Sequence, residues 1–115
     1  MKRRSRLTRS EDIKRVRQEG QSCAHKAIVL CFLSNKLEKN RIAVIAGRSV
    51  GGAVQRNLAK RRIRSAFQGF QYSLHNGFDI VIIARKPILD IEYQSLVDVL
   101  QSLLNKTGLI KDKVN

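Results

Sequence analysis

Short apolar runs along the chain predict three buried β-strands. The runs at 27–33, 41–47 and 78–84 are rich in β-branched residues and are bounded by polar, glycine or proline residues. Only the polar turn 35–40 separates the first two runs, so they are expected to pair as a hairpin. No run approaches the roughly 20 apolar residues that a membrane-spanning helix needs, so no transmembrane segment is predicted.

Helical spacing of apolar residues predicts three helices around these strands. Ser10 is expected to cap the first helix, and Gly20 is expected to end it. The second helix is expected over residues 53–72. The third is expected to follow an N-cap at Asp90, to end at Gly108 and to have one apolar side. The residues of that side are Tyr93, Leu96, Val97, Leu100, Leu103 and Leu104.

The order of these elements predicts one α/β (α+β) domain over residues 1–115. Helix, strands, helix, strand and helix follow one another without an internal repeat or a linker. Residues 1–9 contain five basic residues and no acidic one. They are therefore predicted to form a basic arm that is mobile or that becomes ordered only on a partner.

The charge of the chain indicates a polyanionic partner. There are 23 Lys and Arg residues against 9 Asp and Glu residues, which gives a formal net charge of +14. No acidic residue occurs between Glu38 and Asp79, and six basic residues fall within residues 47–67. Binding of a polyanion offsets such self-repulsion, and the clustering of the charge argues against a merely soluble basic protein.

The second predicted helix has an apolar side and a basic side, because residues three and four positions apart share a helix face. The residues expected to face the sheet are Ala59, Ile63, Ala66, Phe67 and Phe70. The basic side comprises Asn57, Lys60, Arg61 and Arg64. A solvated face is the alternative, but like charges at this spacing destabilise one another, whereas arginine suits bidentate contacts with phosphate. We therefore favour a nucleic-acid interface.

The sequence gives little support for an active site or a metal site within the protein. Cys23, His25 and Cys31 lack the paired spacing of zinc ligands, because the fourth ligand would be the distant His75. Two cysteines also argue against a disulfide scaffold. The acidic residues are scattered, whereas two-metal hydrolysis of a phosphodiester needs clustered carboxylates. No catalytic residue and no metal ligand is therefore predicted.

These patterns leave the kind of nucleic acid open. The sequence has no zinc-finger, zipper or helix-turn-helix pattern and no signature of the common RNA-binding modules. Its 4 Phe and 2 Tyr residues are few for a platform that stacks single-stranded bases. Structured RNA is favoured over DNA, and a ribosomal protein and a DNA-compacting protein are kept as alternatives.

Three blocks of the sequence together resemble the protein component of bacterial ribonuclease P. The segment "RNLAKRRIR" at 56–64 matches the Arg-Asn, Lys-Arg and final Arg of the family's signature helix, and "RSVGGAV" at 48–54 is similar to its lead-in turn. "RLTRSEDIKRV" near the start and "DIVIIARKP" before the last helix are also similar. The resemblance thus covers nearly the whole chain, in the family's order.

This resemblance implies a fold and a function. The fold is a small two-layer sandwich of a mixed sheet and three helices with a left-handed βαβ crossover, against the general preference for right-handed ones. The function is that of the ribonuclease P protein subunit, which binds a catalytic RNA and the 5′ leader of precursor tRNA and assists endonucleolytic removal of that leader. Mg²⁺ and the chemistry would belong to the RNA. A cytoplasmic monomer in a 1:1 complex with the RNA is expected.

The resemblance also implies two binding surfaces. The turn and the second helix would face the catalytic RNA, through Arg48, Ser49, Arg56, Asn57, Lys60, Arg61, Arg62 and Arg64. A cleft between the first helix and the sheet would face the leader, through Ile13, Lys14, Arg17, Ile28, Cys31, Arg85 and Lys86.

The chain departs from the family pattern at three places. The signature helix of the family begins Arg-Asn-Arg, and Leu58 stands at the third of these positions. The neighbouring Arg62 is the candidate to supply the RNA contact of the missing arginine. Gly52 stands where the turn usually has Asn, which removes a side-chain hydrogen bond. The cleft positions that are usually aromatic are not aromatic here. Leader binding is therefore expected to depend on charges such as Arg17 and Lys14 rather than on base stacking.

Overall fold

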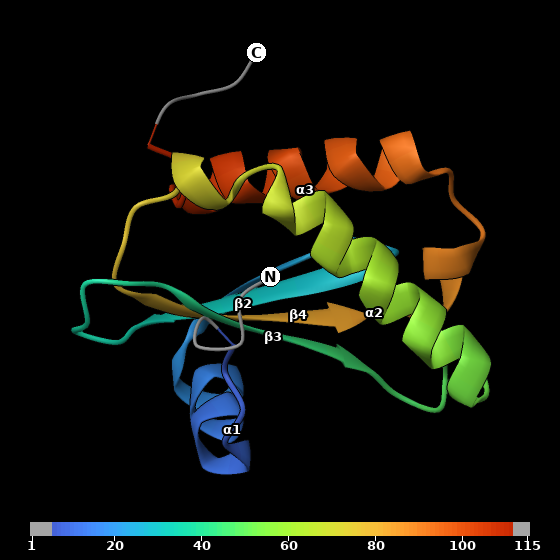
Figure 1. Ribbon diagram of the computed structural model, residues 1–115, viewed down its shortest axis with the longest axis horizontal. Coiled ribbons are helices and arrows are strands. Elements are labelled where there is room, and N and C mark those ends of the chain that lie inside the picture. The colour runs from blue at the N-terminus through green and yellow to red at the C-terminus, as the bar shows by residue number, and fades with distance from the viewer. Residues whose placement is uncertain (1–5, 112–115) are drawn as a thin grey trace.

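The computed structural model describes residues 6–111, which form a mixed four-stranded sheet with helices on both faces (Figure 1). The helices are α1 (Ser10–Glu19), α2 (Ala53–Gln68) and α3 (Tyr93–Thr107), with short 3₁₀-helices η2 (Gln71–Ser73) and η3 (Lys86–Leu89). The strands are β1 (Gln21–Ala24), β2 (Ile28–Ser34), β3 (Arg41–Ala46) and β4 (Phe78–Ala84). The predicted mixed sheet and three helices are confirmed, with α1 as a third, partial layer.

The strand order β1-β2-β4-β3 places β4 between the two strands that the sequence predicts as a hairpin. That predicted pairing is wrong, because β4 pairs antiparallel with β2 and parallel with β3. β4 is apolar and almost entirely buried on both sides. A strand in the centre of the sheet is covered on both faces, so this position suits β4. The hairpin partner of β2 is instead β1, a short polar strand that the apolar pattern does not reveal.

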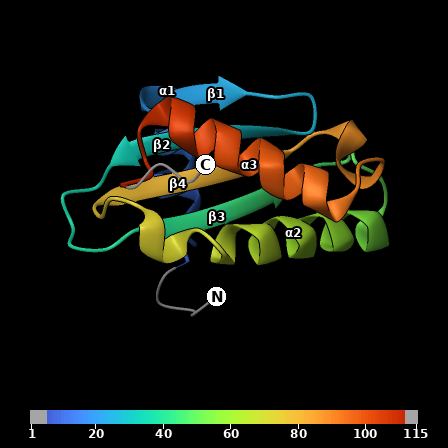
Figure 2. The same ribbon diagram turned by 90° about the horizontal axis from the view of Figure 1, so that it is seen from above.

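The connection from β3 through α2 to β4 is left-handed, as the family resemblance implies (Figure 2). Figure 2 is seen from the α2 face of the sheet: β3 and β4 both run from left to right, and α2 returns from right to left on the side of the sheet nearer to the viewer. A right-handed crossover, the common kind, would place β4 on the other side of β3. As a result, α2 lies along β3 at the edge of the sheet, and one flank of the helix stays uncovered.

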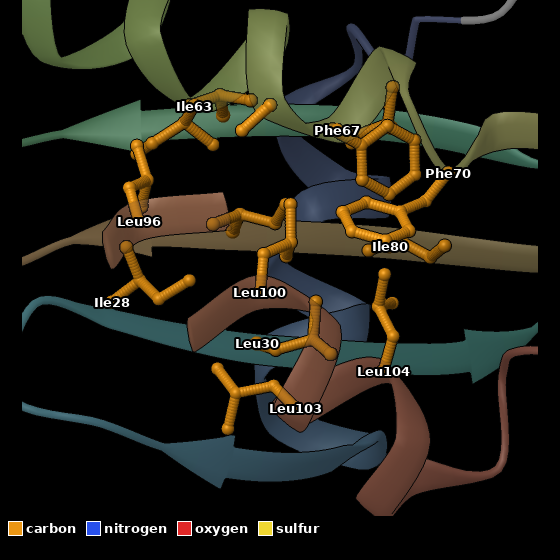
Figure 3. Packing of buried hydrophobic residues seen from close by; sticks show 14 of the residues in the cluster. Ile28, Leu30, Ile63, Phe67, Phe70, Ile80, Leu96, Leu100, Leu103 and Leu104 are labelled. Carbon is orange, nitrogen blue, oxygen red and sulfur yellow. The ribbon is translucent and has the colours of Figure 1, made fainter. Parts of the chain in front are cut away.

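Alternation along β2 separates the interior into two apolar clusters. Ile28, Leu30 and Phe32 belong to the larger cluster, which α2 and α3 cover; Figure 3 shows Ile28 beside Leu96 and Leu30 beside Leu100 and Leu103 of α3. Cys31 points to the other face and belongs to the smaller cluster with Val16 of α1. Because α1 alone covers this second face, part of the sheet beside it stays accessible.

α2 buries the apolar side that the sequence predicts. Buried residues of the helix are Ala59, Ile63, Ala66 and Phe67, and Figure 3 shows Ile63 and Phe67 directed toward the sheet and α3. The helix ends at Gln68, four residues before the expected end at Tyr72, but Phe70 is still buried. Val54 and Leu58 lie on the outer side of the helix and are exposed.

Gly20 ends α1 as expected, and the structure shows why a glycine stands there. A Cβ atom at this position would lie 2.4 Å from the carbonyl oxygen of Phe32 and 2.5 Å from that of Val16. The end of α1 therefore approaches β2 too closely for any side chain. At the other end, Ser10 is the first helical residue, and the N-cap is Arg9, without a side-chain hydrogen bond.

α3 begins later than the sequence predicts. The segment after β4 first forms η3, and the N–H of Asp90 donates to the carbonyl oxygen of Pro87. Asp90 thus closes η3, whereas Glu92 is the N-cap of α3. Gly108 ends α3 as expected, with a φ of 75° that favours glycine. Of the helices within residues 6–111, none is long and apolar enough to cross a membrane.

The first described residues cover the outer edge of β3. Arg6 forms a parallel bridge with Ile42, and the N–H of Leu7 donates to the Ile42 carbonyl oxygen at 2.7 Å. Leu7 is buried under α1. The structure thus places these two residues of the predicted basic arm against β3, and residues 1–5 of the arm lie outside the described residues.

Candidate nucleic-acid interface

α2 presents a band of polar and basic side chains on its uncovered flank, which we call the basic band (Asn57, Lys60, Arg61 and Arg64). Asn57 and Arg61 are exposed, while Lys60 and Arg64 are half-buried. Their spacing places them within about 100° of the helix circumference. No ion pair within residues 6–111 involves α2. The basic band therefore offers three cations that no carboxylate of the described chain neutralises.

Arg6 adds a cation to this band that the sequence did not reveal. Because bridged residues of neighbouring strands point to the same face, Arg6 lies on the α2 side of the sheet together with Ile42. Burial lowers the pKa of Arg64, and the positive charge of nearby Arg6 lowers it further. A bound anion would relieve this like-charge repulsion. The position of Arg6 depends on its pairing with β3, so no local sequence signal could have found it.

Arg62 has a different role from the one that the sequence suggests. Its guanidinium donates to the carbonyl oxygens of Ile88 at 3.0 Å and Ile91 at 2.7 Å. These bonds tie α2 to the segment that joins η3 and α3, on the flank away from the basic band. The expectation that Arg62 replaces the arginine missing at Leu58 is therefore wrong, because both of its terminal amino groups bind carbonyl oxygens within the chain.

The turn before α2 brings further donors close to the start of the helix. Arg48 and Ser49 are exposed, and Arg56 is half-buried in the first turns of α2. This first turn has no acidic residue, so the positive end of the helix dipole is not neutralised locally. Gly51 has a φ of 144°, a conformation that few residues other than glycine adopt, and Gly52 caps the helix without a side-chain bond.

A wide cleft of about 950 Å³ opens on the α1 side of the sheet. Arg17 of α1, together with Arg85 and Lys86 after β4, lines it; these are three of the residues that the family resemblance assigns to a leader cleft. Ser49 also lines this cleft, so the turn assigned to the catalytic RNA borders the surface assigned to the leader. A second groove of about 490 Å³ runs along α1, and Ile13, Lys14 and Arg17 line it.

Two of the predicted cleft residues lie elsewhere. Ile28 is fully buried in the larger cluster on the opposite face of the sheet, so its assignment to the cleft is wrong. Cys31 faces α1 but is buried, and this burial raises the pKa of its thiol while the charge of Arg17 acts in the opposite direction. Val29 and Ile83 instead provide the apolar floor of the cleft. They are paired across β2 and β4 and share the α1 face.

The β1–β2 turn contributes polar groups that the sequence analysis did not assign to the cleft. His25 and Lys26 line it. The Nδ1 atom of His25 accepts a hydrogen bond from the N–H of Ala27 at 3.1 Å, and its carbonyl oxygen accepts one from Arg85 at 3.2 Å. The cleft thus combines an aliphatic floor with a basic rim, which suits a phosphate backbone better than a series of stacked bases.

Two carboxylates of the sheet and α1, Asp79 and Asp12, are engaged with one arginine. Asp79 is 1% exposed and accepts two bonds from the guanidinium of Arg41, at 2.8 and 2.7 Å, and a third from Asn35 at 2.9 Å. Asp12 of α1 lies 3.8 Å from the same guanidinium. Within residues 6–111, no three His, Cys, Asp or Glu side chains are grouped so that they could hold a metal ion.

Comparison with known proteins agrees with this geometry. The family model described as Ribonuclease P matches residues 1–108. The ribonuclease P protein component of Bacillus velezensis is 39% identical over 112 residues, which are 96% of either chain. That of Caldanaerobacter subterraneus subsp. tengcongensis is 30% identical over 109 residues, 95% of this chain and 94% of the relative.

Solved structures of the same family have the same fold. The RNase P protein of Staphylococcus aureus is 27% identical and superposes with a TM-score of 0.84 over 93% of this chain and 98% of its own. The Thermotoga maritima protein is 28% identical, with a TM-score of 0.79 over 88% and 96%. With a family model over nearly the whole chain, close relatives and this shared fold, the chain belongs to the ribonuclease P protein family.

Proposed function

We propose that this chain is the protein subunit of ribonuclease P and that its two basic surfaces have separate ligands. The basic band of α2 and the turn at 48–52 bind the catalytic RNA, while the cleft beside α1 binds the 5′ leader of precursor tRNA. The observation that carries the proposal is the basic band itself, whose cations lie on one flank of one helix without carboxylate partners. A solvated helix face would mix charges of both signs.

In this proposal the protein binds and positions RNA but does not break the phosphodiester bond. The family is part of an endoribonuclease holoenzyme whose protein alone is not catalytic. The described residues also do not fit a Mg²⁺ site, because Asp12 and Asp79 both face Arg41. We therefore assign Mg²⁺ to the RNA. The protein neutralises phosphate charge and raises affinity at physiological salt, as a cytoplasmic monomer in a 1:1 complex.

Reconstitution with catalytic RNA tests this function directly. At a low Mg²⁺ concentration, where the RNA alone cleaves precursor tRNA poorly, adding the purified protein is expected to restore release of the 5′ leader. The reason is that the added cations replace part of the metal screening between two RNA molecules. A ribosomal protein of similar charge should not restore cleavage and serves as the control. Cleavage by the protein without RNA would contradict the division of labour.

Replacing Arg17 by alanine tests the leader cleft. The holoenzyme is expected to lose about 5-fold in its preference for precursor over mature tRNA at 0.15 M salt, and the salt slope of that preference should fall by about one, as for one lost phosphate contact. Equilibrium binding at several salt concentrations measures both quantities. Arg15→Ala is the matched control, because Arg15 lies on the same helix but pairs with Asp12. A leader preference that does not respond to salt would contradict the charge-based cleft.

A further inference from the structure

A small pocket lies at the edge of the sheet beside the end of α2. It has a volume of about 230 Å³, and its floor comprises Ile42 of β3, Phe67 of α2 and Leu74. All three floor residues are almost fully buried. Neither the basic band nor the leader cleft includes this pocket. Its apolar floor and its volume suit one planar ring system rather than a chain of phosphates.

Tyr72 stands at the mouth of this pocket with its ring in solvent. It is 85% exposed, the highest value among the large hydrophobic residues within residues 6–111. The side chain of Tyr72 makes no hydrogen bond and no ring contact within that part of the chain. An exposed aromatic ring beside an apolar hollow offers a face on which a nucleobase can stack.

The polar groups around the mouth favour a base over a phosphate. Gln71 and Asn76 line the pocket, and a side-chain amide can both donate to and accept from the edge of a base. Glu38 and Lys39 also line the pocket, so its rim carries one charge of each sign and is not a cationic site for phosphate, while the carboxylate of Glu38 can accept hydrogen bonds from ring or amino N–H groups. Asn40 holds the wall in place, because it bonds to the backbone of His75 and Phe78.

The pocket continues the line of the basic band. Arg64 lies three residues before Phe67 on α2, so the two side chains share one flank of the helix. Arg6 is bridged to Ile42, whose side chain forms part of the pocket floor. Arg6 and Arg64 do not line the pocket themselves, but each lies next to a residue of its floor, on the side that the basic band occupies.

We propose that this pocket binds an unpaired nucleobase of RNA, stacked on Tyr72, with the adjoining phosphate against Arg6 and Arg64. The inference rests on the proposed function, since it extends the RNA surface of α2 by one nucleotide step toward β3. The ligand is a nucleotide whether it belongs to the catalytic RNA or to precursor tRNA.

Substitution of Tyr72 separates stacking from charge. Tyr72→Ala is expected to weaken RNA binding by about 5- to 140-fold with an unchanged salt slope, because a stacked base is lost but no phosphate contact is. Tyr72→Phe keeps the ring and should bind nearly as well as the native chain. Arg6→Ala should instead lower the salt slope by about one. Since Tyr72 is exposed, thermal unfolding should be nearly the same for all three variants and the native chain.

Two binding measurements identify the source of the base. A loss of affinity for full-length catalytic RNA alone would place the base in that RNA. A loss seen only when the holoenzyme binds precursor tRNA would place it in the substrate. Equal binding by Tyr72→Ala and the native chain in both measurements would overturn the inference. Arg61→Ala, measured in parallel, tests the proposed function separately: if it weakens binding while Tyr72→Ala does not, only the pocket assignment fails.

Discussion

Replacing Lys60, Arg61 and Arg64 together by alanine is expected to weaken binding of the catalytic RNA by about 100-fold at 0.15 M salt. Each phosphate contact contributes about 0.9 to the slope of log K against log salt concentration. Relative to about 1 M salt, one contact therefore raises the affinity at 0.15 M salt by about 0.7 of a decade. Three lost contacts therefore give about two decades, and the total slope should fall by nearly three. Filter binding or fluorescence anisotropy over a salt series measures both.

Two variants serve as controls for this result. Lys106→Ala removes an exposed cation from the last turn of α3, away from the basic band, and should leave the salt slope unchanged. Arg62→Ala removes a basic residue of α2 that is bonded to the carbonyl oxygens of Ile88 and Ile91, so it should lower stability rather than the slope. If the triple variant keeps the native slope, the basic band does not contact phosphate.

The sequence predicts the two sides of α2 because both depend on local periodicity alone. A helix repeats every 3.6 residues, so the spacing of Ala59, Ile63 and Ala66 determines which side is buried wherever the helix docks. The same spacing gathers the basic band on one flank. Gly20 and Gly108 are predicted correctly for the same reason, because the end of a helix depends on backbone conformation within a few residues.

The errors concern contacts between segments that are distant in the sequence. β4 enters the sheet between β2 and β3, and no local pattern distinguishes this order from a simple hairpin. The same limit applies to Ile28. Side chains along a strand alternate between faces, so an error of one position moves a residue from the cleft to the core. Val29 is the residue on the α1 face. Arg62 is a third case, because its partners lie 26 and 29 residues away.

The departures of this chain from the family pattern concern the outer side of α2 and the cleft. Leu58 and Val54 are exposed on one side of α2, and Arg62, four residues after Leu58, lies on that same side but is bonded to the carbonyl oxygens of Ile88 and Ile91. Arg6, which lies beside Arg64, is a better candidate to supply the missing charge, although from a different segment. In the cleft, the aliphatic Val29 and Ile83 under a basic rim favour phosphate contacts over base stacking.

Asp79 connects the parts of the fold that carry both surfaces. Its carboxylate binds Arg41 at the start of β3 and Asn35 in the turn after β2, and the same arginine lies near Asp12 of α1. One buried group thus holds α1 against the sheet and the end of β2 against β3 and β4. The leader cleft depends on the position of α1, and α2 follows directly from β3.

Replacing Asp79 by asparagine is expected to lower the free energy of unfolding by about 3 kcal/mol and the midpoint of thermal unfolding by about 10–20 °C. The variant keeps the size of the side chain but removes the negative charge that compensates Arg41 in a mostly buried place, which is the costly way to break such a pair. Urea denaturation measures the free energy. Asp98→Asn on the exposed side of α3 is the matched control and should change it by less than about 0.5 kcal/mol.

A double-mutant cycle distinguishes loss of the pair from loss of packing. Arg41→Met leaves the carboxylate of Asp79 buried with Asn35 as its remaining side-chain partner, so it should be at least as destabilising as Asp79→Asn. If Asp79 and Arg41 stabilise the fold through their ion pair, the losses in free energy of unfolding should not add. The double variant should then lose about 1–3 kcal/mol less than the sum of the two single losses. Strict additivity would mean that Asp79 acts through Asn35 and the turn after β2 rather than through Arg41.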